Sequence, residues 1–373
     1  MPDIEAIDGV AAGDVEGVNG VAKANIQAIN GVGIAASGAT LWVGAQDDRR
    51  IATAANSDLT SWTAYDAFAG SGSPAPSGSV DHIHCAYGKD GSGNARWVAS
   101  FGSDNPELSY SDSDPTSGNN WTGVNVDSSD QNLPNRSFAM QWGNNVWIAV
   151  GKMSTEAIYR STDGAAWALI DVSGVTGITS TGCYGLAGTG SGTWWFSQQN
   201  RIYQSTNDGT SWALLHTLLN SSDADPGDIR GLTYTNNTLV AYVKGGNIFS
   251  AASSDLTDWS DETALTNGSS IDFQARIASA AGRVVLVLND KKWTMDVSGK
   301  SITMDSNGGD LSGDSTAHGN AESVATDGTT FVVGCATGDV FTSTDGGDSF
   351  AAAATNVGSK NMACIAPNVY LPL

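Results

Sequence analysis

A short signature that ends in an aromatic residue recurs along the chain. Two clear copies are Ile202-Tyr-Gln-Ser-Thr-Asn-Asp-Gly-Thr-Ser-Trp212 and Val340-Phe-Thr-Ser-Thr-Asp-Gly-Gly-Asp-Ser-Phe350. The middle copies are 45 to 47 residues apart, and the last gap spans two periods, with one degenerate copy near residue 305. A period of this length is typical of repeat architectures, in which each unit is one supersecondary element. The aromatic ends of the six copies are Trp62, Trp121, Trp167, Trp212, Trp259 and Phe350.

Each unit between signatures predicts four strands. In the third unit, an inner strand over residues 137–142 precedes a Gly-Asn-Asn turn and the apolar run Val146-Trp-Ile-Ala-Val150, which is typical of a buried strand. A large apolar residue marks the second strand in most units: Trp42, Trp97, Trp147, Trp195, Val240 and Phe331. The pattern predicts seven units, at residues 32–67, 80–124, 135–170, 177–216, 229–262, 274–306 and 317–353.

Seven four-stranded units arranged radially form a β-propeller, an all-β architecture whose blades leave only short edges. The 45 glycines and the charged fraction of 15% fit short strands joined by many turns. The segment Met362-Ala-Cys-Ile-Ala-Pro-Asn-Val-Tyr-Leu371 resembles the start of another unit. We expect it to pair with the first blade and close the ring, with an eighth, mixed blade as the alternative. The predicted propeller domain covers residues 33–373.

The signature resembles the Asp-box, or bacterial neuraminidase repeat, Ser-x-Asp-x-Gly-x-x-Trp. The copy at residues 205–212 has Asn for Asp, the copy at 343–350 has Phe for Trp, two copies are one residue short, and the copy before Trp121 carries an insertion. We expect a tight turn in which the Asp or Asn oxygen accepts backbone amides, Gly takes a positive φ and the aromatic ring plugs the blade. These structural roles are assigned to Asp58, Trp62, Asp163, Trp167, Asn207, Trp212, Asp255, Trp259, Asp345 and Phe350.

The first 32 residues form a different repeat. Residues 3–10, 14–21 and 25–32 are three copies of one octet with a period of 11. We interpret each as a single helical turn, with Asp3, Asp14 or Asn25 as N-cap and a glycine near the end as the left-handed residue. One helical turn is not stable alone in water, so its apolar side chains need an outside surface. The residues expected to dock this arm are Ile4, Ile7, Val10, Val15, Val18, Val21, Ile26, Ile29 and Val32.

Two other interpretations of the arm are weaker. An 11-residue period could indicate a right-handed coiled coil, but a glycine in every copy disfavours it. A disordered leader would be poorer in Ile and Val. The octet resembles the repeated Ile-Asn-Gly-Val segments of tail and other structural proteins of bacteriophages, over about 30 residues. This resemblance implies a virion protein whose arm docks or assembles.

The net charge of −22 disfavours nucleic acid and anionic lipid as partners, because both carry negative charge. The start lacks the basic and apolar regions of a secretion signal, and no apolar run is long enough for a transmembrane helix. A strand-rich, acidic chain without an export signal fits a protein that is made in the host cytoplasm and leaves by lysis inside a virus particle.

Asp-box propellers include sialidases, so a catalytic interpretation must be considered. Sialidases hold the substrate carboxylate with three arginines, one of them in an Arg-Ile-Pro segment, and use a Tyr–Glu pair and an Asp. Here Arg50, Arg201 and Arg276 precede Ile but the proline is missing. Another glycosidase would need two carboxylates across the sugar, which the many Asp residues leave open. Past the arm, the glutamates are Glu107, Glu156, Glu262 and Glu322.

Other candidate sites are weak, and we predict no metal, no cofactor and no catalytic residue. His82 and His84 alternate on one strand face, a spacing that could hold a metal, but no third ligand is evident. Asp305-Ser-Asn-Gly-Gly-Asp310 could bind Ca²⁺ but departs from the EF-hand spacing, so a solvated loop is preferred. The cysteines lie in apolar strand-like contexts and are interpreted as buried thiols rather than disulfides: Cys85, Cys183, Cys335 and Cys364.

We expect a non-enzymatic structural component of a bacteriophage particle: a tail fibre, a collar or a capsid decoration. The arm would bind other virion proteins, and several copies or an oligomer would occupy the particle. The propeller would be displayed, with one face able to bind a host surface glycan or receptor. The alternatives are a carbohydrate-active enzyme, such as a sialidase-like glycosidase or tail-borne depolymerase, and a cellular assembly factor like the Asp-box propellers that help to build photosynthetic complexes.

Overall fold

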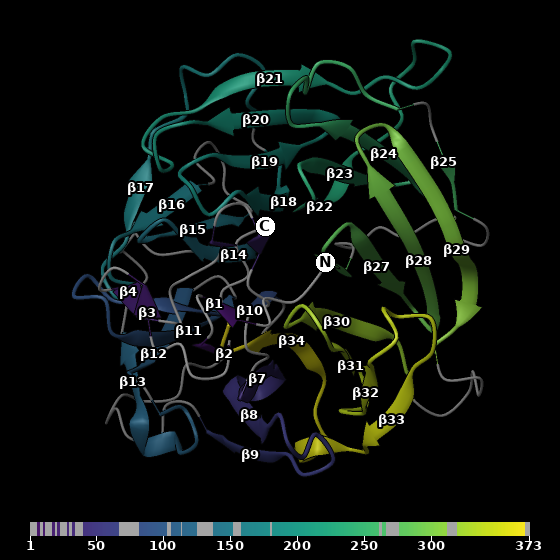
Figure 1. Ribbon diagram of the computed structural model, residues 1–373. Helices are drawn as coiled ribbons and strands as arrows, with labels where there is room; N and C mark the ends of the chain where they lie inside the picture. The colour runs from purple at the N-terminus through teal and green to yellow at the C-terminus, as the bar shows by residue number, and fades with distance from the viewer. Residues whose placement is uncertain are drawn as a thin grey trace.

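The computed structural model describes residues 40–66, 82–102, 106–112, 114–124, 137–151, 158–179, 181–260, 263–265, 276–311 and 319–369, together with six two-residue strands near the start of the chain. Within these residues, seven four-stranded antiparallel sheets stand radially around a central axis (Figure 1). The predicted all-β fold, a seven-bladed β-propeller with four-stranded blades, is confirmed. No helix in this part of the chain is long and apolar enough to cross a membrane.

We number the blades in chain order and give their strands from the axis outwards. Blade 1 contains β34 (Met362–Pro367), β7 (Leu41–Gln46), β8 (Arg50–Ala55) and β9 (Thr63–Asp66). Blade 2 contains β10 (His82–Lys89), β11 (Ala95–Gly102), β12 (Pro106–Asp112) and β13 (Trp121–Val124). Blade 3 contains β14 (Ser137–Gly143), β15 (Val146–Gly151), β16 (Ile158–Ser161) and β17 (Ala168–Ile170). Blades 4 and 5 contain β18 (Cys183–Gly188), β19 (Trp194–Gln198), β20 (Arg201–Ser205) and β21 (Ala213–Thr217); β22 (Ile229–Thr235), β23 (Thr238–Val243), β24 (Asn247–Ala252) and β25 (Thr263–Ala264). Blades 6 and 7 contain β26 (Arg276–Ala280), β27 (Arg283–Leu288), β28 (Lys291–Ser298) and β29 (Ser301–Asp310); β30 (Ala321–Thr326), β31 (Phe331–Cys335), β32 (Val340–Ser343) and β33 (Ala351–Ala354). Short 3-10 turns occur at η3 (Asp47–Arg49), η4 (Gly118–Asn120) and η5 (Val357–Ser359).

The C-terminal strand closes the ring. β34 takes the innermost position of blade 1 and pairs with β7, so that Ile365 lies opposite Gly44. Asn368 extends the link, because its side-chain oxygen accepts the amide hydrogen of Leu41 at 3.0 Å. The predicted pairing of the C-terminal segment with the first blade is confirmed. The eight-bladed alternative is wrong, because the first unit supplies three strands of blade 1 and the C-terminal segment supplies the fourth.

The hydrophobic core lies between the blades. The innermost strands pack side by side in a closed circle, in the order β34, β10, β14, β18, β22, β26 and β30. The buried apolar residues of the described chain fall into seven clusters, and each cluster combines two consecutive blades. The second-strand residues Trp42, Trp97, Trp147 and Trp195 are at most 1% exposed. Packing of blade on blade therefore holds the ring together.

The two faces of the ring differ in their connections. Neighbouring strands in a blade are antiparallel, so the turns after the first and third strands lie on one face, which we name the turn face. The turns after the second strand and the links between blades lie on the opposite face, which we name the connection face. Asn144 and Asn145 form a tight turn on the turn face with φ of 48° and 61°. Positive φ at both positions suits a two-residue hairpin, and Asn tolerates it.

Blade 6 corrects one prediction. A degenerate signature was expected near residue 305, but Ser298 pairs with Ser301 across a two-residue turn and β29 continues to Asp310. Gly299 has a φ of 59°, which allows this tight turn. The acidic segment that was considered as a Ca²⁺ loop is therefore part of a strand. Arg283 ion-pairs with Asp305, and Lys291 ion-pairs with Asp310.

The described residues of the arm form short strand pairs rather than the predicted helical turns. Each 11-residue repeat contributes two short antiparallel strands, the second of which ends one residue past the octet: β1 (Ala6–Ile7) with β2 (Val10–Ala11), β3 (Gly17–Val18) with β4 (Val21–Ala22), and β5 (Ala28–Ile29) with β6 (Val32–Gly33). The register is the same each time, with the Ile or Val before the turn opposite the Val after it. The two intervening residues are Asp-Gly or Asn-Gly, which favour a two-residue hairpin. The helical interpretation gave this glycine a C-cap role and overlooked the hairpin preference of these residue pairs.

Candidate functional site

The signature of blade 3 forms a tight turn held by a serine and an aspartate. Ser161 Oγ donates to Asp163 Oδ1 at 2.9 Å and accepts the amide hydrogen of Gly164 at 2.7 Å. Asp163 Oδ1 also accepts the amide hydrogens of Ala165 and Ala166, at 2.9 and 2.8 Å. Trp167 Nε1 donates to the Gly164 carbonyl at 3.2 Å, which fixes the ring. Burial raises the pKa of Asp163, but the hydrogen bonds outweigh burial and lower the pKa overall.

Blade 4 repeats this arrangement with asparagine in place of aspartate. Ser205 Oγ donates to Asn207 Oδ1 at 2.9 Å, and the amide of Ser211 donates to the same oxygen at 3.0 Å. Trp212 Nε1 donates to the Gly209 carbonyl at 3.1 Å. The side-chain oxygen needed by this turn can therefore come from an amide as well as from a carboxylate.

Blade 7 uses the same bonds, with Phe350 at the aromatic position. Ser343 Oγ donates to Asp345 Oδ1 at 2.7 Å and accepts the Gly347 amide hydrogen at 2.8 Å. The hydroxyl and the amide of Ser349 both donate to the Asp345 carboxylate. These bonds lower the pKa of Asp345, the side-chain bond from Ser349 most of all.

The remaining signature turns are built differently. In blade 1, Trp62 Nε1 donates to the Leu59 carbonyl at 2.9 Å, and in blade 5, Trp259 Nε1 donates to the Leu256 carbonyl at 2.8 Å. Leu59 and Leu256 pack into the clusters shared with the preceding blades. The aspartates of the remaining turns each accept an amide hydrogen from two residues later: Asp58 at 3.1 Å, Asp114 at 3.0 Å and Asp255 at 3.1 Å.

The glycine of the signature touches the preceding blade. Gly209 is buried with a φ of 74°, and a Cβ atom placed on it would lie 2.3 Å from Cδ1 of Ile148 in blade 3. That separation is too short for two carbon atoms, so the turn face of blade 4 can approach blade 3 only through a glycine. The same close approach occurs elsewhere: Gly164 against Val98, and Gly347 against Val285.

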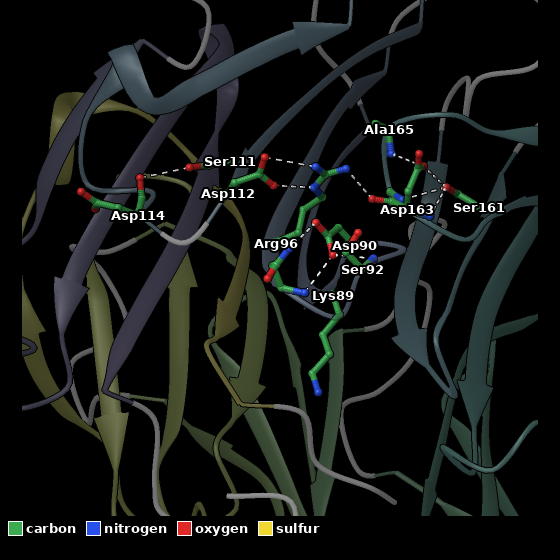
Figure 2. A network of polar contacts seen from close by, with 12 residues as sticks. Lys89, Asp90, Ser92, Arg96, Ser111, Asp112, Asp114, Ser161, Asp163 and Ala165 are labelled. Carbon is green, nitrogen blue, oxygen red and sulfur yellow. Dashed lines mark hydrogen bonds and ion pairs between the residues drawn. The ribbon is translucent and has the colours of Figure 1, made fainter.

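The contact between a signature turn and the preceding blade, which we name the interblade joint, also includes an arginine from the preceding blade (Figure 2). Arg96 of blade 2 donates through Nη1 to the carbonyl of Asp163 in the blade 3 turn at 2.6 Å. Its Nε and Nη2 bind the two carboxylate oxygens of Asp112 at 2.6 and 3.1 Å. Its guanidinium also lies 4.2 Å from the ring centre of Tyr110. Burial lowers the pKa of Arg96, but the bonds to Asp112 outweigh it and raise the pKa.

Two other joints use an arginine in the same way. Arg160 Nε donates to the Asp208 carbonyl at 2.7 Å, and Arg283 Nε donates to the Gly346 carbonyl at 2.8 Å. Sequence reasoning missed these arginines. The available signal was their scarcity: in a chain with 17 basic and 39 acidic residues, Arg96 and Arg283 directly precede the apolar run of a second strand, and Arg160 precedes a signature serine.

The connection face carries polar pairs around the axis. The innermost strands of blades 1, 3, 4, 5 and 7 each contain a β-bulge near their start, and a bulge re-aims the side chain that it carries. At two of these bulges, Arg230 lies 3.9 Å over the Tyr184 ring of blade 4, and Glu322 pairs with Arg276 of blade 6 at 3.2 Å. Arg230 also pairs with Asp228 at 2.8 Å. Each pair links or braces neighbouring innermost strands.

The arginines considered for a sialidase-type site lie in three different blades. Arg50 on β8 donates to the Gly358 carbonyl at 3.1 Å, Arg201 on β20 donates to Gln199 at 2.6 Å, and Arg276 on β26 pairs with Glu322. The structure does not bring these three side chains together. Within the described residues, no group of three or more His, Cys, Asp and Glu side chains could hold a metal. The side chain of His82 lies outside the described part of the chain.

A groove lies at the seam between blades 7 and 1. It has a volume of about 390 Å³ and is lined by Thr60 and Trp62 of blade 1 and by residues 352–358, which run from the outermost strand of blade 7 into η5. Its lining contains no charged side chain. The outermost strand on this side consists of four alanines, β33. A half-buried tryptophan ring, hydroxyl groups and an amide side chain therefore face one shallow, neutral space.

The arm residues are placed in part. Ile7, Val10, Val18, Val21, Ile29 and Val32 lie in the short hairpin strands β1 to β6. Ile4, Val15 and Ile26 lie outside the described residues.

No protein-family model matches the chain, and no curated protein matches it significantly. Solved structures share the fold. PorZ, a surface component of the type-IX secretion system of Porphyromonas gingivalis, has a TM-score of 0.51 and 11% identity over 84% of this chain and 38% of PorZ. YCF48 from Cyanidioschyzon merolae has a TM-score of 0.50 and 15% identity over 74% of this chain and 86% of YCF48. AztD from Citrobacter koseri has a TM-score of 0.50 and 10% identity over 87% of this chain and 96% of AztD. These likenesses show a β-propeller fold.

Proposed function

We propose that the chain is a non-enzymatic structural protein of a bacteriophage particle, anchored by its N-terminal arm and displaying the propeller. The observation that carries the proposal is the way the ring closes. Because β34 fills the innermost position of blade 1, the ring is complete without the arm. The three hairpins, identical in register, are then available to bind other virion proteins in the same manner.

The signature turns fit this role as Asp-box turns with a structural purpose. Their Ser, Asp or Asn, Gly and Trp side chains are used in bonds within the turn or in packing against the preceding blade. A ring with every blade fastened to its neighbour suits a protein that must survive outside the cell. The alternatives, a carbohydrate-active enzyme and a cellular assembly factor, predict other outcomes in the following tests.

Fractionation of the particles tests the anchoring proposal. Lysate of the producing culture is separated on a density gradient, and each fraction is analysed by mass spectrometry. We expect the full chain in the particle band, and we expect a variant lacking residues 1–32 to fold with an unchanged melting temperature but to be missing from that band. Equal incorporation of the two forms would refute a docking arm. Recovery of the full chain only in the soluble fraction would remove the virion proposal.

We further propose that the groove at the seam of blades 7 and 1 binds a neutral sugar of a host surface glycan. A pyranose ring has one apolar C–H face and a rim of hydroxyls, which match the Trp62 ring and the polar groups of Thr60, Thr355 and Asn356. The uncharged lining disfavours acidic sugars such as sialic acid.

Comparison with another seam supports this use of the groove. Between blades 4 and 5, His216 of the outermost strand stacks on Trp259 of the next blade with ring centres 6.1 Å apart. At the seam of blades 7 and 1, alanines take the place of such a side chain beside Trp62. Alanine is depleted in strands, so its fourfold use in β33 is better explained by the space that it leaves than by strand propensity.

A pair of substitutions on one strand tests the groove. Ala352 lines the groove and Ala351 does not, while both are exposed on β33. We expect Ala352→Leu to abolish retention on an array of immobilised bacterial oligosaccharides, and Ala351→Leu to leave retention unchanged. Equal binding by both variants would place any glycan site elsewhere. Release of reducing sugar from the array would support the enzyme alternative.

A further inference from the structure

Two cysteines from distant parts of the chain meet where the ring closes. Cys364 lies on β34, the strand that completes blade 1, and Cys85 lies on β10, the innermost strand of blade 2. Cys364 Sγ is 3.1 Å from the Cys85 backbone nitrogen and 3.5 Å from its carbonyl oxygen. Cys85 Sγ points towards the Val43 carbonyl at 3.6 Å, so the two side chains touch without being bonded.

The position of this pair matters because β34 completes blade 1 and closes the ring. Its ladder with β7 and its packing against β10 and β30 are non-covalent. Release of β34 would open blade 1 and expose the apolar residues of the two clusters that it shares with blades 2 and 7. A covalent bond between β34 and β10 would prevent that opening.

The surroundings favour reaction at one of the two sulfurs. Cys364 is partly exposed, while Cys85 is buried. The neighbouring Cys85 thiol lowers the pKa of Cys364, burial opposes this shift, and His84 adds to the lowering, so that the pKa of Cys364 falls well below its ordinary value. Burial raises the pKa of Cys85. A thiol with a lowered pKa in contact with a second thiol is the arrangement from which disulfides form.

We propose that Cys85 and Cys364 form a disulfide that covalently closes the propeller after the ring has folded. The oxidant is a small-molecule disulfide. The Cys364 thiolate attacks one of its sulfurs, the S–S bond of the small molecule breaks, and one small thiolate leaves. Cys85 then loses its proton and attacks the Cys364 sulfur of the mixed disulfide, which releases the second small thiolate. Two protein thiols are oxidised, one small disulfide is reduced, and the two protons end on the released thiols.

The cross-link affects both the unfolded and the folded state. It joins residues 279 apart in sequence, and a disulfide that closes a long loop restricts the unfolded chain strongly. It also ties the last strand to the blade next to the closure, so partial opening at β34 is blocked. The proposal goes beyond the virion function and does not depend on it.

The full-length protein tests the proposal directly. It is incubated with oxidised glutathione, digested without reduction and analysed by mass spectrometry, and its melting temperature is measured before and after oxidation. We expect a cross-linked peptide pair containing Cys85 and Cys364, a higher melting temperature of the oxidised form, and reversal of both by dithiothreitol. We expect Cys364→Ala and Cys85→Ala to lose both the cross-link and the rise in melting temperature.

Matched controls come from the other two cysteines. Cys183 and Cys335 are buried, and burial raises the pKa of each to about 12. Cys183→Ala and Cys335→Ala should keep the cross-link and the rise. His84→Gln should slow cross-linking without changing which residues are joined. Recovery of both thiols unmodified after oxidation, a cross-link between other cysteines, or a cross-link without any rise in melting temperature would each overturn the proposal.

Discussion

The glycine of the blade 4 signature gives the sharpest test of the interblade joint. Gly209→Ala places a methyl group at positive φ, which costs about 1–2 kcal/mol for a residue with a side chain. The new Cβ would also lie 2.3 Å from Cδ1 of Ile148, a fully buried side chain. Overpacking a close-packed site costs about 1–3 kcal/mol more. We therefore expect Gly209→Ala to lower the free energy of unfolding by about 2–5 kcal/mol.

A second glycine separates strain from packing. Gly93, in the turn after the first strand of blade 2, has a φ of 87°, and a Cβ atom on it would meet nothing within 4 Å. Gly93→Ala should therefore cost only the backbone term of about 1–2 kcal/mol. The difference between the two variants measures how tightly the turn of blade 4 is pressed against blade 3.

A substitution of Ile148, the side chain that Gly209 contacts, tests the packing argument from the other side. Ile148→Val removes the Cδ1 methyl group and should cost about 0.5–1.5 kcal/mol in the native protein. In the Gly209→Ala background it should cost less or become stabilising, because it relieves the collision. Urea unfolding followed by tryptophan fluorescence gives all of these values. If Gly93→Ala costs as much as Gly209→Ala, or if the effects of Ile148→Val and Gly209→Ala simply add, the packing argument fails.

Two further predictions concern the polar part of the joint. Asp163→Asn keeps the hydrogen-bond acceptor that blade 4 uses but removes the charge, so the variant should be less stable than the native protein by about 1 kcal/mol near neutral pH. Because folding lowers the Asp163 pKa, the stability difference between the native protein and Asp163→Asn should be largest above about pH 4 and should vanish as the pH falls through the folded-state pKa. Urea unfolding at several pH values measures this difference. A difference that does not change with pH would show that the charge has no role. Arg96→Met should lower the free energy of unfolding by about 1–3 kcal/mol, because it removes the bond to the Asp163 carbonyl and the pair with Asp112. Lys89→Met should change stability little, since the Lys89 side chain points away from this network in Figure 2. Equal urea midpoints for the two variants would contradict a stabilising role of Arg96 between the blades.

The blades were predictable because their signals are local. The run Val146-Trp-Ile-Ala-Val150 is buried along its whole length as β15, and the Asn144-Asn145 turn before it was visible in the sequence. The closure was predictable for the same reason, since Met362–Pro367 has the apolar pattern of an innermost strand. A pattern that repeats seven times also corrects for weak copies, because each unit supports the interpretation of the others.

The errors arose where one short pattern suits two structures. The end of the octet, Ile-Asp-Gly-Val, can end a helical turn at its glycine or form a hairpin at Asp-Gly, and nothing within the eight residues decides between them. Asp305 and Asp310 fit an acidic loop by composition, yet Arg283 on β27 and Lys291 on β28 balance their charges and allow a strand. The role of Arg96 in the interblade joint could not be predicted from the sequence, because Arg96 and the Asp163 carbonyl are 67 residues apart, in different units.

Blade 6 shows what the signature is for, because it lacks the signature and keeps the joint. Its turn between the third and fourth strands has two residues, and the amide of Gly299 donates to Thr238 Oγ1 in the second strand of blade 5 at 2.8 Å. Lys300 pairs with Asp258 of blade 5 at 2.8 Å. In blades 1 and 5 a leucine fills the same place that a glycine occupies in blades 3, 4 and 7. The fold therefore requires a contact between this turn and the preceding blade. The Ser-x-Asp-x-Gly-x-x-Trp pattern is one of at least three ways to make that contact. This explains why the copies diverge in sequence while the ring remains regular.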